Sequence, residues 1–208
     1  MTRRFATVCV VFIACALTLF SSPSQTQIQA QAKAHDPCED LWFTRNLIMD
    51  RAGLCFASEL GQRVFGNQGC LGTSVLVDAK AARLLQALRG REQLLNCQID
   101  TSAQGLRLPD ASWRMLMIDL PVASQSASIC IGWRADPAPL HSGRDSSSAR
   151  VGIVRPNDTL RYRHDPVGNW HYVTVHDSRW RLKAAGWLRH SHRDGTGRRQ
   201  SCTQVAAG

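Results

Sequence analysis

The chain has 208 residues and a formal net charge of +9, from 25 Lys and Arg against 16 Asp and Glu. Its longest apolar run, residues 5–20, is shorter than the roughly 20 residues that a membrane-spanning helix needs, which excludes an integral membrane protein. Residues 136–208 hold twelve basic residues against six acidic ones, and this concentration of charge indicates a solvated basic surface or an anionic partner.

Residues 1–34 have the order of a secretory signal peptide. Two arginines precede the apolar run, and Ala32 and Ala34 follow it at the small-x-small spacing that a signal peptidase cleaves. Lipid attachment at Cys15 is the alternative, but the apolar run continues past that cysteine. We therefore expect cleavage between residues 24 and 34, a periplasmic or secreted product, and no transmembrane span after cleavage.

Three helices are expected within residues 35–100. Asp36 is placed to cap a first helix over about residues 37–52, and Ser58 to cap a second, shorter one. Apolar residues at three- and four-residue spacing predict a third helix over about residues 78–96. These helices would form a small N-terminal module.

Beyond this module the pattern changes to short β segments separated by turn residues. Within a connecting segment, residues 101–135, we expect one strand at 113–122 and a loop at 123–128. Residues 136–192 predict a small β-barrel, and 193–208 a basic, mobile tail. The predicted fold class is α+β, a disulfide-linked helical module followed by a barrel.

Cleavage of the signal leaves six cysteines, and an even number predicts disulfide bonds in an oxidising compartment. No two of them have the Cys-x-x-Cys spacing of a zinc site, so no metal is expected. If the three helices run alternately up and down, and the ends of the barrel lie close together, the expected bonds are Cys38–Cys70, Cys55–Cys97 and Cys130–Cys202.

The segments "LWFTRNLIMDRAGLCF" and "VFGNQGC" resemble the YARHG domain, an extracytoplasmic bacterial module. The signature positions Met49, Asp50 and Ala52 depart from the family pattern. The resemblance covers residues 38–70 and implies an extracytoplasmic location, but it carries over no activity. The residues that fit the pattern are Leu41, Trp42, Arg45, Asn46, Ile48, Arg51, Gly53 and Phe56.

Residues 136–192 resemble bacterial SH3-like domains, which are small barrels often attached to proteins that act on the cell wall. The matching segments are "LHSGRDSSSARVGIVRPNDTLRY", "NWHYVTV" and "GWLRHSH". The resemblance implies an SH3-like barrel that binds cell-wall polymer or an envelope protein.

Arg45 lies within the apolar stripe of the first helix. A buried guanidinium needs a carboxylate or several carbonyls as partners, so a structural role is expected, with Glu59 as the candidate partner. Anion binding is the alternative role.

Four aromatic residues of the expected barrel could form a groove in which rings stack on sugars or peptide edges. The competing interpretation is that at least half of them fill the barrel core, with Trp180 the most exposed. Histidines at 164, 171, 176, 190 and 192 could bind a metal, but neighbouring arginines favour plain surface imidazoles. The candidate ligand-binding residues are Trp170, Tyr172, Trp180 and Trp187.

No known catalytic motif is present, so neither catalytic residues nor cofactors are expected. The sequence favours an exported, non-enzymatic envelope protein that binds wall material or an envelope protein, without nucleic acid as a partner. An accessory or inhibitor protein that docks on a periplasmic enzyme is the second hypothesis, and a cell-wall hydrolase is the third.

Overall fold

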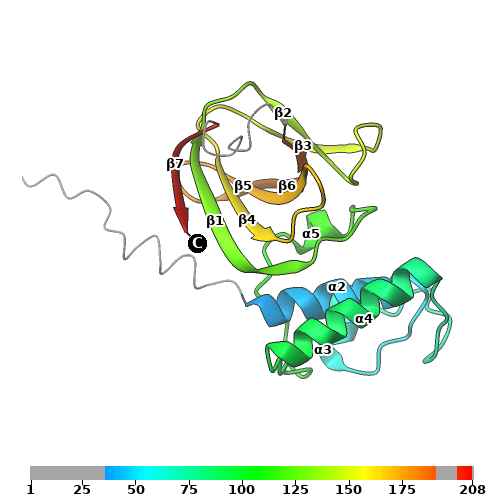
Figure 1. Ribbon diagram of the computed structural model, residues 1–208. Coiled ribbons are helices and arrows are strands. Elements are labelled where there is room, and N and C mark those ends of the chain that lie inside the picture. The colour runs from blue at the N-terminus through cyan, green and yellow to red at the C-terminus, as the bar shows by residue number, and fades with distance from the viewer. Residues whose placement is uncertain (1–35, 191–200, 208) are drawn as a thin grey trace, which may run out of the picture.

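A computed structural model describes residues 36–190 and 201–207. A group of helices packs below a strongly curved antiparallel sheet (Figure 1). This arrangement confirms the predicted α+β class. The predicted signal peptide and the first part of the predicted tail lie outside the described residues.

The helices are α2 (Pro37–Arg51), α3 (Glu59–Phe65), α4 (Ala79–Leu94) and α5 (Ala111–Arg114). Polar side chains cap the first three helices: the backbone N–H of Cys38 donates to Asp36, that of Gly61 to Ser58 and that of Ala81 to Asp78. A cap accepts a hydrogen bond from an N–H group that has no partner within the helix, which is why these starts are visible in sequence. In the described part of the chain, no helix has the length and apolar character required to cross a bilayer.

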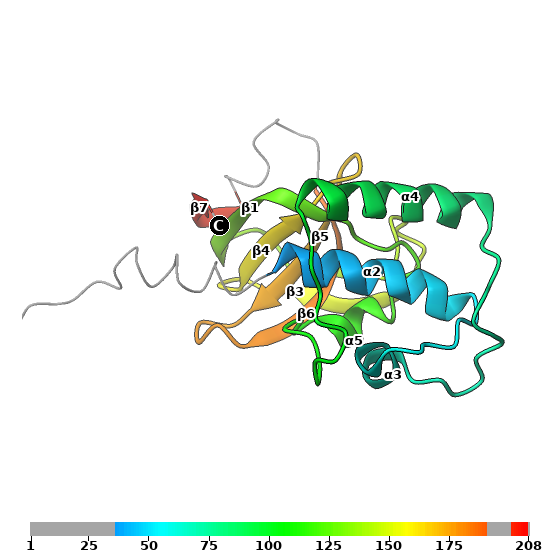
Figure 2. The same ribbon diagram turned by 90° about the horizontal axis from the view of Figure 1, so that it is seen from below.

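Helix α2 is the centre of the helical module and is buried on several sides. Leu41 packs with Leu88 of α4, and Phe43 packs with Leu60 of α3. Asp40, on a further side, is completely buried and contacts residues of the sheet and α5. Figure 2 shows α2 and α4 side by side, with the sheet behind them.

The strands form a single seven-stranded sheet in the order β3-β2-β6-β5-β4-β1-β7, and all adjacent pairs are antiparallel. The two ends of this order are β3 and β7. The strand bounds are β1 (Ala123–Trp133), β2 (Ala138–His141), β3 (Arg150–Val154), β4 (Thr159–His164), β5 (Trp170–His176), β6 (Leu182–Arg189) and β7 (Cys202–Ala207).

Both faces of the sheet carry apolar side chains because successive residues of a strand point to opposite sides. On β5, Val173 and Val175 belong to one core cluster, which also holds the Cys130–Cys202 disulfide. Tyr172 belongs to a second cluster with Trp187 of β6 and Met117, which follows α5. The second face therefore meets the segment that connects the two modules.

The strand predictions within the connecting segment are wrong. Residues 113–122 contain the end of α5 and a loop, whereas the expected loop at 123–128 is the first half of β1. A short apolar run cannot be told from a buried helix or loop by periodicity. Of the serines of β1, Ser128 is held in the sheet by pairing with both β4 and β7. The sheet also extends beyond residues 136–192, since β1 precedes that range and β7 lies in the predicted tail.

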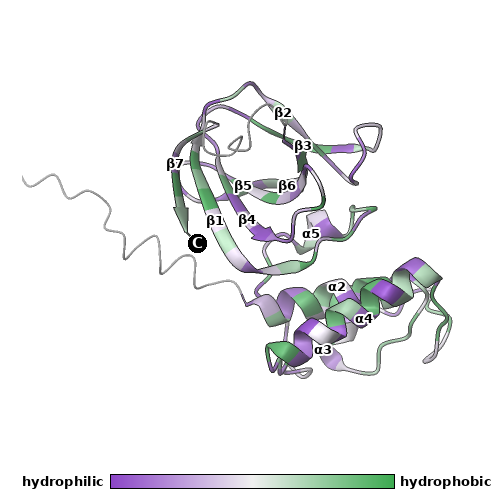
Figure 3. Cartoon of the chain, in the orientation of Figure 1, coloured by the Kyte–Doolittle hydropathy of each residue, from purple (hydrophilic) through white to green (hydrophobic). Residues whose placement is uncertain are grey.

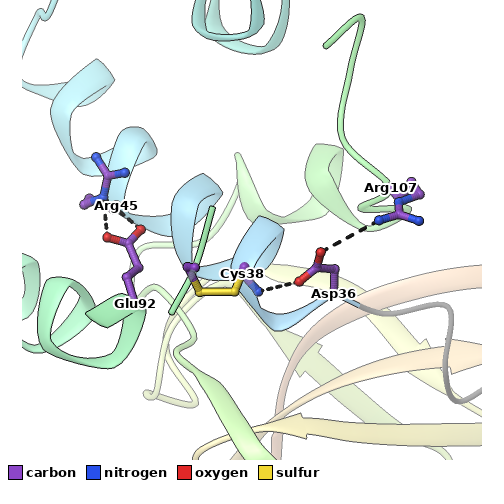
Figure 4. The surroundings of a disulfide bond; sticks show 6 residues. Asp36, Cys38, Arg45, Glu92 and Arg107 are labelled. Atoms are coloured by element: carbon purple, nitrogen blue, oxygen red, sulfur yellow. Dashed lines mark hydrogen bonds and ion pairs between the residues drawn. A yellow bond between two sulfur atoms is a disulfide. The ribbon is translucent and has the colours of Figure 1, made fainter. Parts of the chain in front are cut away.

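All six described cysteines form disulfides, but two predicted pairings are wrong. The bonds are Cys38–Cys97, Cys55–Cys70 and Cys130–Cys202, so only the last was predicted correctly. The up-and-down bundle fails because α3 has seven residues and spans about 10 Å, whereas α2 spans about 22 Å. Cys70 therefore stays near Cys55, while antiparallel α4 brings Cys97 to the start of α2. Figure 4 shows the disulfide at Cys38.

Candidate functional site

A buried charge cluster joins the helical module to the sheet. The guanidinium of Arg114, on α5, donates to both carboxylate oxygens of Asp40 on α2, and its Nε donates to Asp110 at 2.9 Å. His164 Nε2 lies 2.9 Å from Asp40, and the Tyr172 hydroxyl donates to Asp110 at 2.9 Å. The five side chains come from α2, α5 with its preceding residue, β4 and β5, so they tie distant parts of the chain to one point.

The charges in this cluster stabilise one another. Burial alone would raise the pKa of Asp40, but the charges and hydrogen bonds of Arg114 and His164 hold it well below its ordinary value. Burial would lower the pKa of Arg114, whereas Asp110 and Asp40 raise it well above its ordinary value. Burial, together with Asp110, raises the pKa of Tyr172. At neutral pH Arg114 and Asp40 therefore form an ion pair beside a neutral phenol.

This cluster is closed to ligands. Arg114 is 1% exposed and Asp40 is fully buried. A buried ion pair of this kind can specify one packing arrangement, because any shift leaves a charge without a partner. We assign the cluster a structural role, which is to fix the two modules against each other.

Beside the cluster, a groove of about 720 Å³ lies between the two modules. One wall is formed by α4, the end of α2 and the loop before α4; the other is formed by the segment after α5, the β4–β5 turn and Arg144. Its volume is within the range of small-ligand sites. The apolar residues of the lining are Ile48, Ala52, Leu76, Val77, Ala81, Leu84, Ala87, Ile118, Leu120, Val122, Val167 and Trp187.

The carboxylates of the groove are already engaged. Asp119 pairs with Arg144 at 3.0 Å and with Lys80 at 3.3 Å, and Asp165 pairs with Arg91 at 2.8 Å. The third lining carboxylate, Asp78, caps α4. Because Lys80, Arg91 and Arg144 are engaged in the same pairs, the groove offers a ligand a mainly apolar surface.

Large apolar side chains stand exposed at the edge of the groove. Leu76 is 97% exposed, Ile118 is 66% exposed, and Val167 is also exposed. Figure 3 shows that α4, which forms much of one wall, carries both hydrophobic and hydrophilic residues. Exposed apolar side chains gathered around a groove are typical of an interaction site.

The four predicted ligand-binding aromatics do not come together in one groove. Tyr172 and Trp187 are core residues, and the Trp187 indole donates to the Asp119 carbonyl at 2.7 Å. Trp170 and Trp180 are partly buried and lie at opposite ends of the β5–β6 hairpin. Of the four, Trp187 alone lines the inter-module groove.

Arg45 pairs with Glu92 and not with the predicted Glu59. Its Nε donates to both oxygens of Glu92, at 2.9 and 3.0 Å, and so links α2 to α4 (Figure 4). The Arg45 side chain is partly exposed, at 24%. The contact is a bridge within the helical module.

The described histidines are dispersed among different surroundings. His164 belongs to the buried cluster, His176 lies beside Trp180, and the rings of His171 and His190 are 4.7 Å apart. Across residues 36–190 and 201–207, no group of three or more His, Cys, Asp or Glu side chains is placed to hold a metal ion. His192 lies outside the described residues.

Neither the buried cluster nor the groove was predicted from the sequence. Asp110 and Arg114 are four residues apart, the spacing of a helical ion pair, and this was an available signal. Nothing local marks Asp40 as their partner, because it lies 74 residues before Arg114. The groove likewise joins segments from both halves of the chain.

A disulfide-bonded helical module fixed to a seven-stranded antiparallel sheet defines a two-module protein of an oxidising compartment. Residues 96–207, more than half of the chain, match the model of the "Domain of unknown function (DUF4453)", and the chain belongs to this family. Residues 18–93 match the model of the YARHG domain, an extracytoplasmic domain. Neither curated proteins nor solved structures yield a match to this chain.

These matches confirm one of the two sequence resemblances. The YARHG resemblance is confirmed, and its match begins inside the segment predicted as a signal peptide. The C-terminal match is to DUF4453, so the SH3-like resemblance stays a prediction. The boundary between the matches falls at the end of α4, so both the buried cluster and the groove lie between the two domains.

Proposed function

We propose that this protein is an exported, non-enzymatic envelope protein that binds an apolar segment of another envelope protein in the inter-module groove. The groove between the two family domains carries this proposal. Its lining is mostly apolar, and its rim exposes Leu76 and Ile118 to solvent. The disulfides and the YARHG domain support an extracytoplasmic site of action.

The composition of the groove favours a protein segment over a glycan. Sugars need several hydrogen-bonding groups, whereas each carboxylate that lines the groove is already paired or caps a helix. Apolar side chains of a partner would bury the leucine and isoleucine of the rim and gain about 25 cal/mol for each Å² removed from water. A partner that is itself an envelope enzyme would make this protein an accessory or an inhibitor.

Binding of wall polymer is the second candidate function. The basic excess of the C-terminal domain favours it, since wall and envelope polymers include anionic ones. This mode of binding would weaken as salt is raised, whereas apolar docking in the groove would not.

The test uses two charged substitutions at the rim, Leu76→Glu together with Ile118→Glu. Both side chains are exposed, so the free energy of unfolding should remain close to that of the wild type. We expect retention of the envelope partner on immobilised protein to fall at least about tenfold, because a charge would have to be buried in the contact. Retention is measured by quantitative mass spectrometry of envelope proteins, followed by titration with the purified partner.

Leu94→Glu is the matched control, because Leu94 is 68% exposed on α4 but does not line the groove. Equal loss in the control and in the rim variant would contradict the proposal. Salt-sensitive sedimentation with purified peptidoglycan, unaffected by the rim variant, would favour the wall polymer instead. Clearing of a wall suspension by the protein would show a hydrolase and overturn the non-enzymatic assignment.

A further inference from the structure

A second feature, separate from the groove, lies where β4 meets the β5–β6 turn. Arg161 and Arg163 are on one face of β4, two residues apart, and Arg161 pairs with Thr174 of β5. Their α-carbons are about 6.6 Å apart along the strand, and both side chains leave the same face of the sheet. Neither arginine lines the inter-module groove.

Trp180 forms the back of this feature. The guanidinium carbon of Arg161 lies 4.9 Å from the centre of the Trp180 ring, a cation–π contact. Trp180 has a φ of +61°, in the left-handed region that a bulky side chain rarely adopts. Strained backbone of this kind is found preferentially at functional sites.

The turn that holds Trp180 is organised by Asp177. Its carboxylate accepts from the backbone N–H groups of Arg179 and Arg181, at 2.9 and 3.0 Å, and from the Arg181 side chain at 2.7 Å. The Trp180 carbonyl lies 3.2 Å from His176 Nδ1. The indole is therefore held over Arg161 before any ligand arrives.

Arg161 has hydrogen-bonding capacity to spare. Among the described residues its Nε is buried without a hydrogen-bond partner, and it forms no ion pair with any of the described carboxylates. The cationic neighbours of Trp180, by contrast, are matched: Arg181 pairs with Asp177, and Lys183 pairs with Asp158. A buried N–H group without an acceptor costs free energy, and an acceptor supplied by a ligand would remove that cost.

The pKa shifts of the groups around Trp180 are those expected of a site that favours a bound anion. Burial lowers the pKa of Arg161, and burial together with the charge of Arg161 lowers that of Arg163 to about 10, while the charges of Asp110 and Asp40 oppose the shift. Burial also lowers the pKa of His176; the Trp180 carbonyl opposes this shift, and the charges of the two arginines add to it. Asp110 also opposes the shift of His176, so the carboxylates offset the positive field at these groups only in part, and a bound anion would offset it further.

We propose that Arg161 and Arg163, backed by Trp180, bind the phosphoryl group of a phosphomonoester. Such a group carries a charge of about −1.5 to −2 and three acceptor oxygens, which suits two guanidinium groups better than a singly charged carboxylate does. The phosphoryl group could belong to a lipid headgroup or to a soluble ester. This site is separate from the protein-binding groove, so the rim variant of the groove should leave phosphate binding unchanged.

Inorganic phosphate is the first probe, with acetate for comparison. We expect phosphate to bind more tightly than acetate by calorimetry, and to raise the pKa of His176, followed by NMR, because the anion offsets the two arginine charges. Arg161→Gln should weaken phosphate binding at least about tenfold, and Arg161→Lys should weaken it less. The control is Arg179→Gln, in the same turn, which should bind phosphate as the wild type does.

Trp180→Gly is a second variant, which tests phosphate binding at this site even if Arg161→Gln is poorly folded. Glycine accepts a positive φ without strain, so the turn should persist while the ring is lost and phosphate binding weakens. Vesicles containing phosphatidic acid identify a lipid source if they bind in an Arg161-dependent way; binding of phosphate alone identifies a soluble source. Equal phosphate binding by wild type and Arg161→Gln, or an unchanged His176 pKa, would overturn the proposal.

Discussion

Replacing Arg114 with methionine is expected to lower the free energy of unfolding by about 3–5 kcal/mol. The substitution leaves the carboxylates of Asp40 and Asp110 buried without their cation. It also removes the guanidinium from its positions over the rings of Phe43 and Tyr172. The measurement is urea unfolding of the oxidised protein at neutral pH, monitored by tryptophan fluorescence and circular dichroism.

Two further variants separate loss of the cluster from a general effect of substitution. Arg107→Met breaks the exposed ion pair with Glu39, one residue before Asp40, and should cost less than about 1 kcal/mol. Adding Asp40→Asn and Asp110→Asn to Arg114→Met removes the orphaned charges and should restore part of the stability. A loss for Arg114→Met no larger than that for Arg107→Met would contradict the assigned role.

Removing the Cys130–Cys202 disulfide by a double alanine substitution is expected to cost about 2–5 kcal/mol. This bond closes a separation of 72 residues and ties edge strand β7 to β1. Removing Cys55–Cys70, with a separation of 15, should cost about 1 kcal/mol less, because the shorter loop constrains the unfolded chain less.

Non-reducing peptide mapping tests which cysteines are joined. The peptide with Cys38 should be recovered joined to the one with Cys97, and Cys55 joined to Cys70. Recovery of a Cys38–Cys70 peptide would contradict the arrangement of the helices. A greater loss of stability from the short loop than from the long one would contradict the expected order.

The starts of the helices could be predicted from neighbouring residues, but the contacts between the helices could not. Asp36 and Ser58 act on N–H groups within three residues, so their effect is visible in a short window of sequence. The partner of Arg45 is 47 residues away on α4, and its identity depends on how the helices pack. The disulfide pairings of the helical module failed for the same reason.

The candidate site was still less accessible to sequence analysis. Trp187 and Tyr172 were correctly considered as possible core residues, because alternate positions on a strand must face a core. The groove depends on α4 lying opposite Ile118 and Val167, and the Arg114 cluster is one of the contacts that hold these segments together. β1 was missed because its serines have weak strand preference and are held by their neighbours.

The YARHG and DUF4453 domains form one unit whose junction creates the groove. Differential scanning calorimetry of the oxidised protein shows whether they unfold together. The buried cluster predicts a single cooperative transition, with a calorimetric enthalpy equal to the van't Hoff enthalpy. Two separate transitions, one for each domain, would contradict it.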